Sequence, residues 1–195
     1  MKKIIIATSN KGKVRELKDE FRQLDVELVP LSELEVQYPE PVEDGKTFAE
    51  NSLIKAKYYQ ERTGCACLAD DSGLEVDLLG GAPGVYSARY SGEHDQPKNN
   101  KKLAAELEKL PEKESPAAYQ CALTFVDEDG AVLAAQGYCR GIVKPVARGN
   151  GGFGYDPYFY IGEKTMAELT LEEKQAISHR GAAIREMAAK LKERL

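Results

Sequence analysis

The chain has 195 residues, a formal net charge of −5 and a charged fraction of 30%. Its size predicts one compact domain or two closely joined lobes, and its acidic balance disfavours a nucleic-acid-binding protein, which needs a basic face. No apolar run approaches the roughly 18–20 residues of a membrane span, and the apolar run at 4–7 is too short for a signal peptide. We therefore expect one cytoplasmic domain over residues 1–195, with no nucleic-acid or membrane partner.

The first half of the chain alternates apolar segments with polar loops. Apolar residues recur at helical spacing in the segment that begins at Lys11. Thr47 and Glu50 form a capping-box pattern, which marks the start of a second helix. Residues 36–46 contain two prolines and a glycine, which indicate a loop. The elements predicted in order are a strand at 4–7, a helix from about 11, a loop at 36–46, a helix from 47 to 64, a buried strand at 65–69 and a structured loop with short strand pieces at 73–90.

The second half combines a hairpin with a final helix. Residues 127–130 read DEDG, a hairpin turn, and Thr170 with Glu173 forms a second capping box. The elements predicted here are a helix at about 98–110, strands at 119–126 and 131–143, a glycine-rich loop at 148–160 and a final helix with Ile184, Met187, Leu191 and Leu195 on one face. Early helices that alternate with strands, followed by a hairpin, predict an α/β fold with a mixed, partly antiparallel sheet.

The four cysteines are Cys65, Cys67, Cys121 and Cys139. A single residue separates the first two, which is not the usual zinc spacing, and no histidine lies near them in the sequence. We expect buried, reduced thiols that pack as small apolar side chains.

The segment ATSNKGK at 7–13 lies where a strand gives way to a helix. The N–H groups and the dipole at a helix N-terminus favour anions, and Lys11 and Lys13 add full positive charges. The segment lacks the flanking glycines of a P-loop. Two interpretations stay open: the segment binds phosphate, or Ser9 or Asn10 caps the helix and the lysines are solvated.

Carboxylates gather in two places, with Glu43 and Asp44 before the second helix and Asp70 and Asp71 after the buried strand. Mg²⁺ usually binds one or two carboxylates together with substrate phosphates and water. Adjacent carboxylates repel each other unless a cation or a basic group is near. The alternative is that one aspartate forms an Asx-turn with the Ser-Gly that follows, while the other is exposed.

Two later segments carry further candidates. In GGFGYDP at 151–157, the glycines allow close approach to a ligand and Phe153 can stack on a base, or it anchors a mobile loop. The segment EKQAISHRG at 173–181 contains three side chains that can donate hydrogen bonds to base edges or to phosphate. These donors are Lys174, His179 and Arg180. The alternative is that the histidine has a structural role.

The chain resembles the inosine/xanthosine triphosphate pyrophosphatase family in five stretches: TSNKGK, TFAENSLIKAK, LADDSGLEVDLLGGAPGVYSARYSG, GGFGYDPYF and AELTLEEKQAISHRG. The resemblance runs from about residue 3 to residue 192. It implies an elongated, two-lobed α/β protein around a long mixed sheet flanked by helices, with the active site in the cleft between the lobes. It implies hydrolysis of ITP, dITP and XTP to the monophosphate and pyrophosphate, which keeps these nucleotides out of DNA and RNA. It also implies Mg²⁺ and a homodimer.

The resemblance further implies residue roles. Asp71 is similar to the family's proton acceptor and, with Glu43, to its magnesium carboxylates. Residues at positions that resemble substrate contacts are Thr8, Ser9, Asn10, Lys11, Gly12, Lys13, Ser72, Phe153, Gly154, Tyr155, Asp156, Lys174, His179 and Arg180. The first six resemble phosphate contacts, residues 153–156 resemble a base-and-sugar loop, and the last three resemble contacts near the purine.

Rival functions are a nucleotide pyrophosphatase of another specificity, such as one for a modified pyrimidine, and a nucleotide-binding sensor without turnover. A sensor has no need for a general base such as Asp71. An RNA-binding protein is disfavoured because the chain is acidic and has no surface run of aromatic and basic residues.

Overall fold

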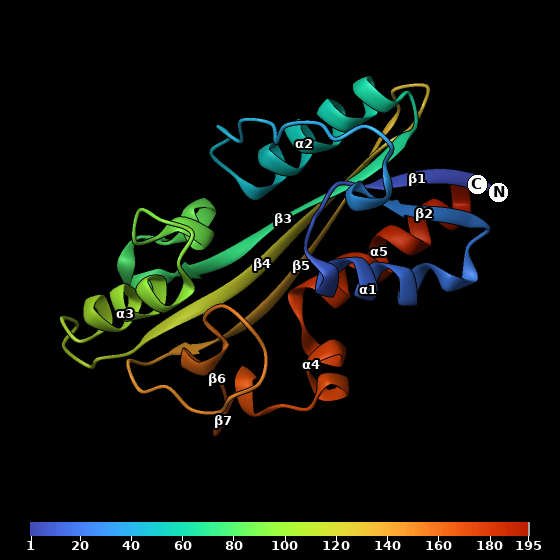
Figure 1. Cartoon of the computed structure of the whole chain (residues 1–195). Coiled ribbons are helices and arrows are strands. Elements are labelled where there is room, and N and C mark those ends of the chain that lie inside the picture. Colours follow the sequence, from blue (N-terminus) through green and yellow to red (C-terminus); the bar gives the residue numbers. More distant parts are fainter. Residues whose placement is uncertain (195) are drawn as a thin grey trace. The chain divides into compact units, whose positions relative to one another are not determined.

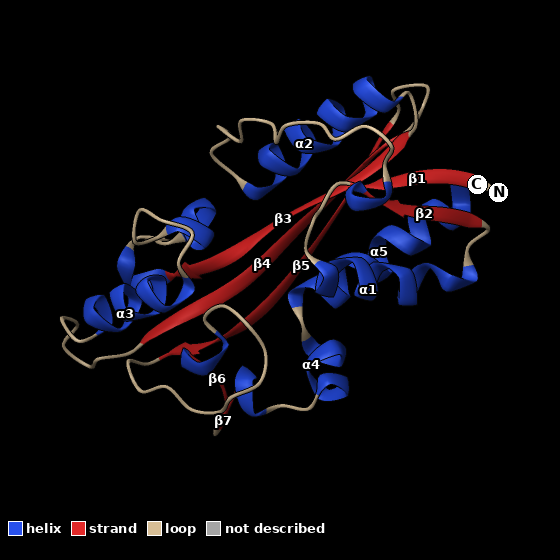
Figure 2. Ribbon diagram, in the orientation of Figure 1, coloured by secondary structure: helices blue, strands red, loops and turns tan. Residues whose placement is uncertain are grey.

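The structure, a computed structural model, describes residues 1–194 and contains one mixed β-sheet (Figure 1). Its strands, in chain order, are β1 (Lys2–Ile6), β2 (Val26–Pro30), β3 (Ala66–Val76), β4 (Ser115–Val126), β5 (Val132–Val143), β6 (Phe159–Ile161) and β7 (Lys164–Thr165). The order across the sheet is β2-β1-β3-β4-β5-β6-β7 (Figure 2). β1 pairs in parallel with β2 and β3, whereas β6 pairs antiparallel with β5 and β7. The predicted mixed sheet is confirmed, and it is open because β2 and β7 are its edges.

Helices flank the sheet. They are α1 (Lys11–Glu20), α2 (Phe48–Thr63), α3 (Gln96–Leu107), α4 (Leu171–Ile177) and α5 (His179–Arg194). The predicted capping box of Thr47 and Glu50 begins α2, and Gly64 ends it in the left-handed conformation that glycine adopts without a steric penalty. None of the described helices is long and apolar enough to cross a membrane.

The chain forms two compact units. Unit one contains Met1–Asp71, Cys121–Gly137 and the chain from Gly181 onward, and unit two contains Ser72–Gln120 and Tyr138–Arg180. The long strands β3, β4 and β5 contribute to both units, so the prediction of one domain over 1–195 stays a prediction while each unit has its own core.

In unit one the sheet is covered on both faces (Figure 1). Alternate residues of β1 point to opposite sides, so Ile4 and Ile6 join the apolar cluster of α1 and α5, whereas Ile5 joins that of α2. The predicted inner face of the last helix is confirmed for Ile184, Met187 and Leu191, all nearly fully buried, and Leu195 lies outside the described residues. This double cover explains why β1 reads as an unbroken apolar run.

Unit two has a separate core between α3 and its part of the sheet. Its apolar cluster contains Leu74 and Val76 of β3, Leu103 and Leu107 of α3, and Tyr119 of β4. The predicted buried thiols are confirmed for Cys67, Cys121 and Cys139, whereas Cys65 is only partly buried, and no cysteine of the described chain forms a disulfide.

One predicted boundary, the end of the buried strand at 69, is wrong. β3 continues to Val76, past the predicted strand end at 69 and into the predicted loop at 73–90, so the run Asp70–Gly73 lies inside a strand rather than in an Asx-turn. Pairing in the sheet and burial of Leu74 and Val76 outweigh the turn preference of Asp, Ser and Gly. The predicted capping box of Thr170 and Glu173 is present and begins α4, and the final helix α5 begins at His179.

Candidate active site

The segment that leads into α1 is capped by its own side chains. Asn10 Oδ1 accepts hydrogen bonds from the N–H groups of Gly12 (2.9 Å) and Lys13 (3.2 Å), and the Asn10 N–H donates to Thr8 Oγ1 (3.2 Å). The exposed residues of the segment are Ser9, Asn10, Lys11 and Gly12. Capping by Asn10 is therefore confirmed, and contact of the segment with phosphate stays a prediction.

Lys13 extends from the first turn of α1 to an aspartate of β3. Its Nζ lies 2.7 Å from Asp70 Oδ2, and the Asp70 side chain is only 2% exposed. A carboxylate buried to this degree is stable only when it is paired with a cation. Lys13 thus neutralises one of the two adjacent carboxylates that the sequence places together.

A second lysine, Lys55 of α2, supplies charge to the other carboxylates. Its Nζ lies 3.1 Å from Glu43 Oε2 and donates to the Asp70 carbonyl oxygen at 3.1 Å. Burial lowers the pKa of Lys55, but the carboxylates of Asp70, Glu43 and Asp71 outweigh burial and raise that pKa above its ordinary value. Lys55 is therefore a cation, and Glu43 rather than the exposed Asp44 belongs to this cluster.

Asp71 has the most perturbed acid group of the cluster. Burial raises the pKa of its carboxyl group to about 6, although Lys55 and a hydrogen bond from Asn51 act in the opposite direction. The nearby carboxylates of Glu43 and Asp70 raise this pKa as well. A carboxylate that takes up a proton close to neutral pH is suited to act as a general base.

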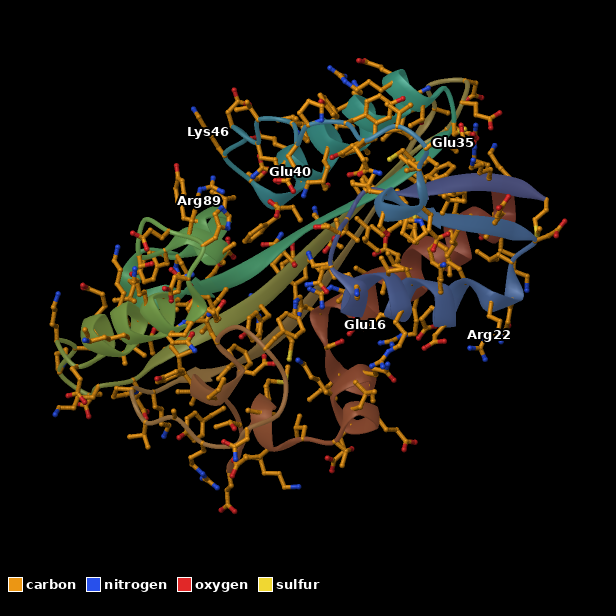
Figure 3. All side chains as sticks on the ribbon, viewed as in Figure 1. Glu16, Arg22, Glu35, Glu40, Lys46 and Arg89 are labelled. Carbon is orange, nitrogen blue, oxygen red and sulfur yellow. The ribbon has the colours of Figure 1, made fainter. Side chains whose placement is uncertain are left out.

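Asn51 joins the Glu43 loop to this cluster. Its side chain is buried, and its Oδ1 accepts a hydrogen bond from the Gly45 N–H at 2.8 Å. A Cβ at Gly45 would lie 2.6 Å from that same oxygen, so only glycine fits at this position. Figure 3 shows Glu40 and Lys46 on the same loop, which leads into α2.

The acidic corner, defined here as Glu43, Asp70 and Asp71, has three carboxylates for the two lysines Lys13 and Lys55. Within residues 1–194, no group of three or more His, Cys, Asp or Glu side chains is arranged to hold a metal ion unaided. Mg²⁺ does not require such a cage, because it accepts one or two carboxylates and completes its shell with phosphates and water. The carboxylate oxygens of the acidic corner therefore fit a hard divalent cation.

Unit two holds a second group of predicted residues around a buried aspartate. Asp156 Oδ2 accepts hydrogen bonds from the Phe153 N–H (2.8 Å) and from Lys174 Nζ (2.6 Å). Phe153 is 51% exposed, and Lys174 Nζ lies 4.4 Å from the centroid of its ring. An exposed ring held by its own backbone beside a cation is a suitable platform for a heteroaromatic base.

Arg180 and His179, the first residues of α5, complete this second group. Arg180 Nη2 donates to Ser72 Oγ at 3.1 Å, and its guanidinium carbon lies 5.4 Å from the Phe153 ring centroid. Both side chains are buried, and the His179 imidazole stacks on Tyr119. Predicted residues from β3, the 151–157 loop, α4 and α5 thus gather within unit two.

Tyr155 differs from its neighbours because its side chain points into the core. The ring is buried and its hydroxyl donates to the Ser87 carbonyl oxygen at 2.6 Å. Gly154 beside it has a φ of +66°, which glycine adopts freely. The Tyr155 side chain therefore anchors the loop, and only its backbone remains available to a substrate.

Comparison with known proteins identifies the family. A model described as the Ham1 family matches residues 4–190. The chain belongs to the Ham1 family. It is 48% identical over 187 residues to a dITP/XTP pyrophosphatase of Geobacter sulfurreducens, with 94% of each chain covered.

Solved structures agree with this Ham1 assignment. A HAM1 protein from Coxiella burnetii has a TM-score of 0.91 at 37% identity, covering 99% of this chain and 100% of that one. A nucleoside-triphosphatase / dITP/XTP pyrophosphatase from Mycobacterium abscessus has a TM-score of 0.80 at 43% identity, covering 97% and 98%. The predicted resemblance and fold class are both confirmed.

Two residues of this Ham1-family chain were not among the predicted site residues. Lys55 and Asn51 lie one turn apart on α2, within the stretch TFAENSLIKAK. Their spacing of four residues places them on one face of the helix, which was a usable signal. A lysine and an asparagine on the mostly apolar inner face of α2 indicate that polar groups pack against this face, but the sequence does not identify those groups.

Gly152 offers a test of how the 151–157 loop is held. A Cβ at this position would collide with the Asp156 carboxylate, and the φ of +71° disfavours any other residue. We expect Gly152→Ala to lower the free energy of unfolding by about 1–2 kcal/mol through backbone strain and by roughly another 1.5–3 kcal/mol through loss of the Asp156 hydrogen bonds. Urea denaturation measures the change.

The matched control is Gly162→Ala. Gly162 has a φ of +62°, and no atom lies within 4 Å of the position that a Cβ would occupy, so this substitution introduces the backbone strain alone. Equal destabilisation by the two substitutions would contradict the clamp of Asp156 on this loop.

Proposed function

We propose that this chain hydrolyses the non-standard purine nucleoside triphosphates ITP, dITP and XTP to the nucleoside monophosphate and pyrophosphate. The observation that carries the proposal is the acidic corner, where burial raises the pKa of Asp71 to about 6, Lys13 pairs with Asp70 and Lys55 pairs with Glu43. The relatives from Geobacter sulfurreducens and Mycobacterium abscessus are named dITP/XTP pyrophosphatases, which supports the same reaction.

In this proposal the residues of each unit have their own role. Residues Thr8–Lys13 of unit one bind the triphosphate, with Lys13 and the N-terminal end of α1 as the positive groups. Phe153, Lys174 and the start of α5 in unit two bind the base. Within unit two, Ser72 of β3 accepts a hydrogen bond from Arg180, which belongs to the same base-binding group.

Glu43 and Asp71 are the residues that we propose for Mg²⁺. When bound, the ion supplies positive charge to the phosphate oxygens and lowers the energy of the charged transition state. Lys55 pairs with Glu43, so its ammonium group also keeps the Glu43 carboxylate oriented toward the corner.

Asp71 accepts a proton from a water molecule that attacks the α-phosphorus. A bond forms between the water oxygen and the α-phosphorus, the bond from the α-phosphorus to the bridging oxygen breaks, and pyrophosphate leaves with the electron pair. Lys13 stabilises the charge that develops on the leaving phosphates. In the metal-free site the carboxyl pKa of about 6 leaves Asp71 largely ionised at neutral pH, so its carboxylate is available to accept a proton.

Base selection follows from donors in unit two. Hypoxanthine and xanthine present a 6-keto oxygen and an N1–H, whereas adenine presents an amino group and a bare N1. A buried donor such as the Arg180 guanidinium or the His179 imidazole pairs with the keto oxygen but faces another donor, the amino group, when adenine occupies the site. Mismatches of this kind can discriminate between substrates by orders of magnitude.

A turnover assay on ITP, dITP, XTP, GTP and ATP, with Mg²⁺ and with EDTA, tests the proposal. We expect metal-dependent formation of monophosphate and pyrophosphate, and a kcat/KM for ITP at least about 100-fold above that for ATP. In H₂¹⁸O the label should enter the monophosphate, because water attacks the α-phosphorus. Label in pyrophosphate, diphosphate as product, or equal turnover of ATP would contradict the proposal, and binding without turnover would favour a sensor.

We also propose that the chain is a cytoplasmic homodimer, which is the state that the family resemblance implies. The described helices contain no membrane span, which agrees with this location. Light scattering after size-exclusion chromatography would give the mass of the assembly, to be compared with the chain mass of 21.5 kDa.

A further inference from the structure

We propose that Tyr119 is a positioning residue for base recognition, whose ring sets the plane of the His179 imidazole and whose hydroxyl lies beside Asp156. Tyr119 belongs to β4 and was not among the predicted site residues. The inference rests on the proposed function, because it gives Tyr119 a role in supporting the residues that would contact the purine.

The stack between Tyr119 and His179 is nearly parallel. The ring centroids are 4.9 Å apart with an interplanar angle of 13°, and both side chains are less than a tenth exposed. Tyr119 also packs against Phe159, with ring centroids 4.6 Å apart and an interplanar angle of 39°. Tyr119 is therefore held by the core and presents one ring face to the histidine.

His179 needs such a support because of its place in the chain. It is the first residue of α5, directly after the break from α4, so no preceding turn of the same helix packs against it. The last side-chain torsion of histidine is broad and does not by itself fix the ring plane. The stack on Tyr119 therefore helps to fix the direction in which the imidazole donates or accepts a hydrogen bond.

The Tyr119 hydroxyl is buried and has no hydrogen-bond partner among the described residues. Burial raises the pKa of Tyr119 well above its ordinary value, and the negative charge of the Asp156 carboxylate raises it further, so the phenol is neutral. Asp156 in turn holds the Phe153 N–H and Lys174. Tyr119 thus adjoins both His179 and the aspartate that orders the 151–157 loop.

A purely packing role would not favour tyrosine here. A phenylalanine fills nearly the same space without burying a hydroxyl, whose transfer from water costs free energy unless it finds a polar partner. Phe125, six residues further along β4, is fully buried and is such a packing residue. It provides the matched control because its replacement removes a buried ring from the same strand in unit one.

The experiment compares Tyr119→Leu, Tyr119→Phe and Phe125→Leu. The chain has only two histidines, His94 and His179, so imidazole ¹H–¹³C NMR spectra are simple to assign. We expect Tyr119→Leu to shift the His179 resonances downfield as the ring current is lost, while those of the exposed His94 stay unchanged. Tyr119→Phe keeps the ring and should keep most of the His179 shift.

Binding and kinetics then separate positioning from folding. Tyr119→Leu should weaken binding of inosine monophosphate and lower kcat/KM for ITP by about threefold to tenfold, the range of an aromatic pair, with pyrophosphate binding unchanged. Phe125→Leu should lower the melting temperature without these losses, and Tyr119→Phe should lose less than Tyr119→Leu.

Two results would overturn the inference: His179 resonances that do not move in Tyr119→Leu, or an equal loss of inosine monophosphate binding in Phe125→Leu. A wild-type protein that turns over no purine triphosphate would instead refute the proposed function. The NMR spectra report the stack in either case, so the two failures are distinguishable.

Discussion

Replacing Asp71 with asparagine is expected to lower kcat for ITP by about 10²–10⁴-fold, the usual contribution of a general base. Asparagine keeps the size and one oxygen of the side chain, but it cannot accept the proton of the attacking water. Steady-state kinetics with saturating Mg²⁺ measures the loss. A variant that retains full turnover would remove Asp71 from this role.

The same substitution is expected to stabilise the metal-free fold at neutral pH. The folded-state pKa of Asp71 is about 6 against an ordinary value of 3.8, so the folded protein binds the proton more tightly than the unfolded chain does. Stability from this group is present below pH 4 and is lost as the pH rises from about 4 to about 6. Asp71→Asn should therefore gain about 1–3 kcal/mol at pH 7.5 and nothing at pH 4.

Urea denaturation in EDTA at the two pH values measures this difference. Asp44→Asn is the control, because Asp44 is an exposed acid next to Glu43 and its replacement should change neither turnover nor stability. A loss of stability in Asp71→Asn at pH 7.5 would mean that burial of its charge is fully compensated in the folded state.

Lys13→Met is expected to have the largest effect on stability. It leaves the buried Asp70 carboxylate without the cation that lies 2.7 Å away, and breaking a buried ion pair from one side typically costs about 3–5 kcal/mol. Lys11→Met, which changes an exposed side chain in the same segment, should stay within about 0.5 kcal/mol of the wild type. Chemical denaturation measures both values.

The double variant Lys13→Met/Asp70→Asn separates the structural role of Lys13 from its proposed contact with phosphate. Removing both charges should recover most of the lost stability, because no ion remains buried alone. Turnover and pyrophosphate binding should stay low, since the proposed phosphate cation is still missing. Recovery of wild-type turnover together with stability would show that Lys13 serves only to neutralise Asp70.

Much of the fold was predictable because it depends on local patterns. The Thr47–Glu50 capping box, the hairpin turn at 127–130 and the inner face of α5 follow from backbone geometry within a few residues, and all three are present. The extent of β3 was not predictable in the same way. Its polar second half is a strand because neighbouring strands pair with it, which outweighs the turn preference of Asp, Ser and Gly.

The sequence by itself determined the family, because five motifs in a fixed order carry that information without reference to their positions in the fold, and it supplied candidates for the residues of the site. Only the tertiary structure decided which of these residues meet. Arg180 reaches Ser72 across 108 residues of chain, and Lys55, not foreseen, joins Glu43 to β3. Such contacts depend on how strands and helices pack, and the burial that packing produces is also what raises the Asp71 pKa.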